Sequence, residues 1–241
     1  MREFLEASIE ANKEIAKLIA SNSHEFLCKE LTLGAGGDIS RRVDLKAEEI
    51  FIKYLQKFGN IHSEECGFVP GLAEFDIVVD PIDGSDNFAS NFPYFGTSVA
   101  LKYKNKCIAA VITNLANGDI FYKDKDLFQK ANLDTLIFED MKKNNIAKVG
   151  IFERVYRSKT IFGKLKKEKI KFRSPGAFAL SLAYAHDVTF VVYEGDMRVY
   201  DVEAGLYMCD DLYKTTENGL LIISKDKEIF DRISQLFRKG E

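Results

Sequence analysis

The hydrophobic positions of this chain recur with two spacings, one typical of helices and one typical of strands. Between residues 2 and 20, apolar side chains stand at near-helical spacing among Glu, Lys and Asn, which predicts an amphipathic helix. The same spacing over residues 43–58 predicts a second helix. The segment between the two, residues 31–42, is rich in Gly and polar residues and predicts a mobile loop.

Short β-branched runs bounded by turn residues predict strands in both halves of the chain. Residues 124–147 are charged and weakly patterned, so we expect an N-terminal α+β half, residues 1–130, and a C-terminal α/β half, residues 131–241. Besides the central motif below, the predicted strands are residues 98–103, 106–113, 119–123, 148–152, 170–173, 188–193 and 220–224, and the later helices are residues 177–185, 201–208 and 226–237.

One stretch combines a strand pattern with candidate chemistry. Residues 75–79 form a short β-branched run that predicts a buried strand ending at Asp80, and the sequence DPIDGSDNF begins there. Pro81 cannot donate to a sheet, so we expect the strand to stop. Gly84 favours a tight turn, and Ser85 is a good N-cap for a following helix.

Such a turn can aim two carboxylates, Asp80 and Asp83, at one point, while the free N–H groups of the helix start face an anion. Carboxylate oxygens beside a phosphate are typical of a Mg²⁺ site. The dipeptides Asp-Pro and Asp-Gly are also common in plain turns. From these residues alone, a simple turn and a metal-assisted phosphate site both remain open.

Composition narrows the class of protein. With 46% hydrophobic and 29% charged residues, the chain is typical of a soluble globular protein, and its net charge of -3 does not indicate nucleic acid as a partner. No apolar run approaches the roughly 20 residues of a membrane span. Glu6 and Glu10 stand where a signal peptide would be apolar, so we expect a cytoplasmic protein without a membrane partner. The cysteines are far apart, which favours reduced thiols over a zinc or redox site.

Several segments resemble the inositol monophosphatase family, which consists of Mg²⁺-dependent, often lithium-sensitive sugar-phosphate phosphatases. The stretch from Asp80 to Phe88 resembles its signature D-P-[IL]-D-G-[ST]-x-N-F. Residues 63–67, SEECG, resemble its [GS]-E-E-x-G element, although adjacent acids before a glycine are by themselves typical of a solvated loop. Residues 200–205, YDVEAG, resemble its W-D-x-A-A-G element, with Tyr200 in place of the usual Trp. The resemblance implies a layered α+β / α/β sandwich (αβαβα) of the sugar-phosphatase type.

The resemblance also implies a metal centre that holds two or three Mg²⁺ ions. Glu64 and the Ser85 hydroxyl would position and deprotonate the attacking water, and Asp44 would orient that hydroxyl. Asp44 is equally explained as an acid in the first turn of the second helix, and both interpretations can hold together. The implied metal ligands are Glu64, Asp80, the carbonyl of Ile82, Asp83 and Asp201.

Further residues are implied as substrate contacts. Residues 173–177, RSPGA, resemble the family element R-x-x-G-[AST], whose backbone borders the sugar, although the same residues also suit a strand, turn and helix start. The implied substrate-binding residues are Asp83, Gly84, Ser85, Gly176, Ala177, Glu194 and Arg198.

The substrate is left open among related readings. Tyr200 and Arg198 are features of the archaeal-type members, which often accept fructose 1,6-bisphosphate as well as inositol 1-phosphate. Relatives that hydrolyse 3′-phosphoadenosine 5′-phosphate usually have D-G-T-K-E-F. Where that pattern ends in K-E-F, this chain has Asp86-Asn87-Phe88. A regulatory binding protein of the same family is the third hypothesis, because some bacterial members act on the transcription machinery. The expected partners are a small phosphorylated substrate and a second copy of the chain in a homodimer, whereas the segment after Gly205 is shorter than usual and leaves subunit contacts open.

Overall fold

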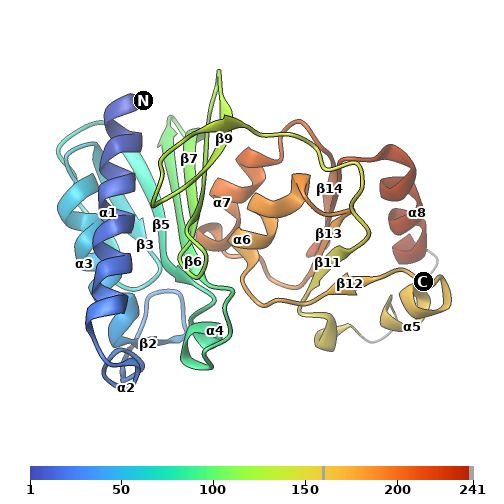
Figure 1. The fold of residues 1–241 in the computed structure, drawn as a ribbon, viewed down its shortest axis with the longest axis horizontal. Coiled ribbons are helices and arrows are strands. Elements are labelled where there is room, and N and C mark those ends of the chain that lie inside the picture. Colours follow the sequence, from blue (N-terminus) through green and yellow to red (C-terminus); the bar gives the residue numbers. More distant parts are fainter. Residues whose placement is uncertain (159–160, 239–241) are drawn as a thin grey trace.

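The computed structural model describes residues 1–158 and 161–238, and its elements form alternating layers of helices and sheets (Figure 1). Starting from the N-terminal helices, the order is helices, a large sheet, helices, a small sheet and helices. This is the αβαβα sandwich that the family resemblance implies, so the predicted fold class is confirmed.

The first helix layer consists of α1 (Arg2–Ser21) and α3 (Arg42–Leu55). Both helices bury one apolar stripe against the large sheet, with Ile15 and Phe51 fully buried. Burial of such stripes, more than intrinsic helix propensity, stabilises helices of this kind. Both predicted helices are therefore confirmed, although the second ends three residues before the predicted position because Gly59 already begins a strand.

The large sheet has eight strands in the order β10-β9-β8-β7-β6-β5-β3-β4. Strands β3 and β5 run parallel, and the remaining neighbours run antiparallel. The strands are β3 (Gly59–Ser63), β4 (Gly67–Val69), β5 (Phe75–Asp83), β6 (Gly96–Tyr103), β7 (Lys106–Asn114), β8 (Asp119–Asp124), β9 (Phe128–Asn132) and β10 (Glu139–Asp140).

Strands β9 and β10 occupy part of the weakly patterned region, so this segment continues the large sheet rather than forming a plain linker. The division of the chain at residue 130 stays a prediction, and β9 crosses that position. Residues 159–160 and 239–241 of the predicted second half lie outside the described residues.

The expected loop over residues 31–42 is instead largely a hairpin, formed by β1 (Glu30–Leu33) and β2 (Ile39–Arg41). Every side chain of β1 is exposed, so this strand has no buried face whose alternation could reveal it in the sequence. The short helix α2 (His24–Leu27) connects α1 to the hairpin.

The middle helix layer consists of α6 (Phe178–Ala183), extended by η2 (Tyr184–His186), and α7 (Val199–Met208). Ala204 and Met208 of α7 share a core with Val78 of β5 in the large sheet. Leu182 of α6 shares another core with Val191 in the small sheet. The layer is therefore apolar on two sides, as packing between two sheets requires.

The small sheet has the order β12-β11-β13-β15-β14. Strand β11 runs parallel to both β12 and β13, so its carboxyl end lies at the same edge as theirs. The predicted set lacked β14, whose side chains are mostly exposed. The strands are β11 (Gly150–Glu153), β12 (Phe172–Arg173), β13 (Val191–Glu194), β14 (Tyr213–Glu217) and β15 (Leu220–Ser224), and the outer helices are α5 (Ile161–Lys167) and α8 (Lys227–Arg238).

Among the helices that the structure describes, none combines the length and apolar character needed to cross a membrane.

The contact between α6 and α7 yields a stability prediction. A Cβ at Gly205 would lie 2.4 Å from Cβ of Leu182, so Gly205→Ala should force the two helices apart and lower the free energy of unfolding by about 1–3 kcal/mol. Gly163→Ala is the matched control, because the same added atom would meet nothing within 4 Å on α5 and should leave stability equal or slightly higher. Urea denaturation measures both, and equal stabilities of the two variants would contradict the packing described.

Candidate metal centre and active site

The central motif departs from its predicted form in two ways. Strand β5 continues through Asp83, with a register shift between Asp80 and Asp83 that accommodates Pro81. Gly84, with φ of 87°, is the N-cap of the short helix α4 (Ser85–Ala89), so Ser85 is the first helical residue and not the cap. The left-handed conformation of Gly84 favours glycine at this corner.

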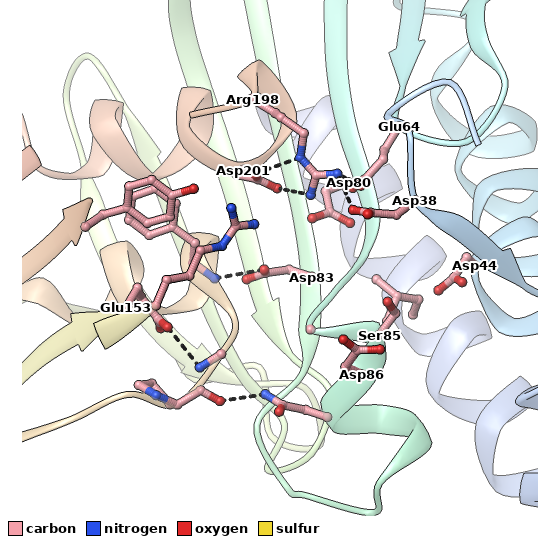
Figure 2. A pocket seen from close by; sticks show the side chains of 18 of the residues that line it. Asp38, Asp44, Glu64, Asp80, Asp83, Ser85, Asp86, Glu153, Arg198 and Asp201 are labelled. Carbon is pink, nitrogen blue, oxygen red and sulfur yellow. Dashed lines mark hydrogen bonds and ion pairs between the residues drawn. The ribbon is translucent and has the colours of Figure 1, made fainter. Parts of the chain in front are cut away.

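Three buried carboxylates converge next to this turn. Glu64 follows β3, Asp80 lies on β5 and Asp201 lies in the first turn of α7, and each offers an oxygen within 4.8 Å of the others (Figure 2). They line a cavity of 740 Å³ that also reaches Asp83 and Ser85. Residues from the large sheet and from the middle helix layer therefore build one acidic cluster, which we call the carboxylate cluster.

Burial and mutual repulsion disfavour negative charge in this cluster. Burial raises the pKa of Glu64 to about 7, opposed by Arg198 and reinforced by Asp201. Burial also raises the pKa of Asp80 well above its usual value, and the charges of Glu64 and Asp83 raise it further. Like charges held in a low-dielectric site are stabilised by a cation. The donors are all hard oxygens, so the set fits Mg²⁺ better than a softer metal.

Asp83 lies beside the cluster but has partners of its own. Its two carboxylate oxygens accept hydrogen bonds from the backbone N–H groups of Phe178, at 2.9 Å, and Leu180, at 2.8 Å. Each oxygen keeps a second lone pair, so these bonds leave room for a metal ligand role. Burial raises the pKa of Asp83 well above its usual value, and the Leu180 hydrogen bond opposes this shift.

Arg198 is the cation that the structure places at the carboxylate cluster. Its Nη1 lies 2.6 Å from Glu64 Oε1 and 2.7 Å from Asp38 Oδ2, and its Nε and Nη2 donate to Asp201 at 3.0 Å each (Figure 2). One guanidinium thus pairs with three carboxylates, so its single positive charge cannot balance all of them when they are ionised.

The β1–β2 hairpin covers Glu64. The N–H of Gly36 donates to the Glu64 carbonyl at 2.6 Å, and a Cβ at Gly36 would lie 2.6 Å from Glu64 Cγ. Glycine is therefore required for this close approach. The turn between β1 and β2 therefore lies directly against Glu64 of the carboxylate cluster.

Asp44 and Ser85 are arranged differently from the expected pair. Oδ2 of Asp44 accepts from the backbone N–H of Arg41 at 2.6 Å and so caps α3, as the first-turn interpretation predicts. The hydrogen bond of the Ser85 hydroxyl comes from Arg41 Nη1, at 3.2 Å. Among the described residues, no hydrogen bond joins Asp44 to Ser85, and the second carboxylate oxygen of Asp44, Oδ1, has no hydrogen-bond partner.

With this geometry established, comparisons with known proteins decide the family. A family model described as the inositol monophosphatase family matches residues 1–211. The chain belongs to the inositol monophosphatase family.

Several proteins are similar to this member of the inositol monophosphatase family. A bifunctional NADP phosphatase/NAD kinase of Methanocaldococcus jannaschii is 29% identical, over 87% of this chain and 43% of that protein. A fructose-1,6-bisphosphatase/inositol-1-monophosphatase of the same organism is 28% identical, over 83% of this chain and 85% of that protein. The chain thus spans less than half the length of the first relative.

A solved structure of the extragenic suppressor protein SuhB from Bartonella henselae has the same fold as this inositol monophosphatase family member. It superposes with a TM-score of 0.79 at 20% sequence identity and covers 100% of this chain and 99% of that chain. At this identity the likeness concerns the fold, which agrees with the layered sandwich described above.

The predicted substrate contacts lie at different depths in this inositol monophosphatase family site. Gly84, Ser85, Gly176 and Arg198 line the cavity. Ala177 is buried, and its Cβ would lie 2.9 Å from a Cβ at Gly84, so it packs behind the turn. Glu194 ends β13 and is not among the described residues that line the cavity. The predicted roles of all of these residues stay predictions.

Sequence reasoning missed Glu153, a buried acid that lines the cavity from the end of β11. Its carboxylate accepts from Gly176 N–H at 3.0 Å and from the Ser181 hydroxyl. Its position directly after the apolar run of a predicted strand was the available signal, because strands of open α/β sheets place ligand-facing residues at their carboxyl ends. Also missed were Arg41, Arg154 and Arg157, which carry no motif.

The buried carboxyl of Asp44 yields a pH prediction. Burial raises the pKa of Asp44 to about 7, whereas an unfolded Asp has a pKa of about 3.9, so stability is lost as the pH rises between these values. Asp44→Asn stays neutral and still accepts from Arg41. It should therefore gain stability over wild type by on the order of 1–2 kcal/mol more at pH 8 than at pH 5, as measured by urea denaturation.

Asp134→Asn is the matched control for this pH prediction, because Asp134 is exposed and outside the cavity. Its stability difference from wild type should be the same at both pH values. A pH-independent effect of Asp44→Asn would contradict the raised pKa.

Proposed function

We propose that this protein is a Mg²⁺-dependent phosphomonoesterase that hydrolyses a sugar or inositol phosphate, inositol 1-phosphate or fructose 1,6-bisphosphate. The observation that carries the proposal is the convergence of Glu64, Asp80 and Asp201 within 4.8 Å in a buried cavity. Burying three carboxylates from separate parts of the chain together costs free energy. Metal ions of a phosphate-binding centre would offset that cost.

In this proposal the carboxylate cluster holds two or three Mg²⁺ ions together with Asp83 and the carbonyl of Ile82. When bound, Mg²⁺ supplies a Lewis acid for phosphoryl oxygens and lowers the pKa of a bound water. The protein's part is to fix the ligands: the bonds from Phe178 and Leu180 hold Asp83 in one orientation, and β5 holds Asp80.

The remaining roles fall on Glu64, Ser85 and Gly84. Arg41 Nη1 donates to Ser85 Oγ, so the Ser85 hydroxyl proton is free to be donated to a substrate or water oxygen. Glu64 is then the group that accepts the proton of the attacking water, because its carboxylate lines the cavity beside Asp80 and Asp201. The backbone N–H groups of Gly84 and Ser85 are proposed to bind phosphate oxygens.

The side chain of Asn87 favours the sugar-phosphate reading over 3′-phosphoadenosine 5′-phosphate. Its Nδ2 donates to the carbonyls of Tyr94 and Pro175, at 2.7 Å each, and so ties the 80–88 motif to the segment that bears Gly176. The D-G-T-K-E-F pattern of the nucleotide-type relatives has Glu at this position, and a glutamate could donate neither bond. The homodimer implied by the family resemblance stays part of the proposal.

The test is phosphate release from inositol 1-phosphate, fructose 1,6-bisphosphate and 3′-phosphoadenosine 5′-phosphate, with Mg²⁺ and then with a chelator. We expect release that requires Mg²⁺ and is fastest with a sugar or inositol ester. Asp80→Asn should lower turnover by about 100-fold or more, since even residues that only orient metal ligands cost about 10- to 100-fold.

The matched control for this loss is Asp134→Asn, which removes an exposed carboxylate and should keep wild-type turnover. Release that persists in the chelator, or in Asp80→Asn, would contradict the metal mechanism. Folded protein that releases no phosphate from any ester would favour the regulatory reading.

A further inference from the structure

Two arginines outside the carboxylate cluster line the same cavity. Arg154 follows Glu153 at the end of β11, and Arg157 ends the 3-10 helix η1 (Val155–Arg157). Figure 2 shows Glu153, the neighbour of Arg154, well separated from Ser85 and Asp86 on the α4 side of the cavity. The two guanidinium groups therefore belong to the wall that the C-terminal half contributes.

These arginines differ from the other two in the cavity. Arg41 is paired with Asp86 at 2.9 Å, and Arg198 is paired with Glu64 and Asp201. Within residues 1–158 and 161–238, neither Arg154 nor Arg157 forms an ion pair with a carboxylate. The carboxylate nearest in sequence, that of Glu153, already accepts bonds from Gly176 and Ser181.

Both guanidinium groups lie over aromatic rings instead. The Arg154 guanidinium carbon lies 5.3 Å from the ring centroid of Tyr193, and that of Arg157 lies 6.0 Å from the ring centroid of Tyr156. A ring contact holds the side chain without consuming its N–H donors, which remain available to an oxyanion. Guanidinium groups match phosphate oxygens through paired N–H donors.

A substrate with one phosphate would leave this cationic wall without an anionic partner, because its phosphate belongs at the carboxylate cluster. We propose that Arg154 and Arg157 form a subsite for a second phosphate group, so that the substrate carries one phosphate that is hydrolysed and another that is bound here. This inference rests on the proposed function and narrows its substrate to bisphosphates, either sugar bisphosphates or phosphorylated nucleotides.

The exposed ring of Tyr156 lies on the same wall of the cavity. It helps to decide between a sugar bisphosphate and a phosphorylated nucleotide as the substrate. Its side chain is 76% exposed although it lines the cavity. An exposed aromatic ring beside phosphate-binding donors can stack on a nucleobase, whereas a sugar bisphosphate has no group that needs it. The experiment therefore includes both classes and a Tyr156 variant.

The test compares Arg154→Gln and Arg157→Gln with wild type on inositol 1-phosphate, fructose 1,6-bisphosphate and NADP. We expect KM for a bisphosphate or dinucleotide substrate to rise by about 10-fold or more in each variant, the loss typical of one hydrogen bond to a charged group, with kcat little changed. KM for inositol 1-phosphate should stay within about 2-fold of wild type, since this monoester does not reach the subsite. Arg154→Lys should recover part of the loss.

The matched control is Lys171→Gln, which removes one exposed positive charge from the same half of the chain outside the cavity. It should leave KM unchanged for every substrate. Tyr156→Ala should raise KM for NADP alone if the source is a nucleotide, and for no substrate if the source is a sugar bisphosphate.

The outcomes separate the two levels of the account. Hydrolysis of inositol 1-phosphate by wild type, with Arg154→Gln and Arg157→Gln shifting KM equally for all substrates or for none, overturns the subsite and leaves the phosphatase intact. A wild-type protein that hydrolyses no ester overturns the proposed function, and the subsite falls with it.

Discussion

The repulsion among the buried carboxylates of Glu64, Asp80 and Asp201 is the constraint on which the site depends. Their convergence within 4.8 Å is costly in a low-dielectric cavity, and burial raises the pKa of Glu64 and of Asp80. The fold must therefore hold these side chains together against their own electrostatics. Arg198 offsets part of the charge, and under the proposed function divalent cations would offset the rest.

The packing of helix and sheet layers holds these carboxylates close together. Asp80 lies on a central strand of the large sheet, and α7 carries Asp201 to it while packed between two sheets. Two glycines allow close contacts around this centre. Gly205 lets α7 pack directly against α6, and Gly36 lets the hairpin turn lie directly against Glu64. Apolar burial on both sides of the middle layer thus stabilises an acidic centre that would not assemble by itself.

Local patterns predicted the local structure, and resemblance predicted the assembly. The helix predicted over residues 43–58 follows from the spacing of its apolar residues alone, because one of its faces is buried. The sequence pattern did not predict the hairpin because β1 is exposed. It predicted that β5 ends at Asp80, whereas the strand continues to Asp83, because a register shift accommodates Pro81. The spacing of residues in the sequence could not predict that Asp201 lies close to Asp80, since their contact depends on tertiary packing. The Arg41 contact with Ser85 joins the end of β2 to the start of α4, and it depends on tertiary packing that no sequence pattern specifies. The same holds for Arg154 and Arg157, which lie at the start and the end of η1.

The central claim is that the carboxylate cluster binds divalent cations, and direct ion binding tests it without reference to any substrate. Isothermal titration calorimetry of Mg²⁺ into wild-type protein and into Asp80→Asn is the decisive measurement. The account predicts two or three bound ions for wild type and the loss of at least one of them in the variant. Identical titrations, or no Mg²⁺ binding by correctly folded wild-type protein, would contradict it.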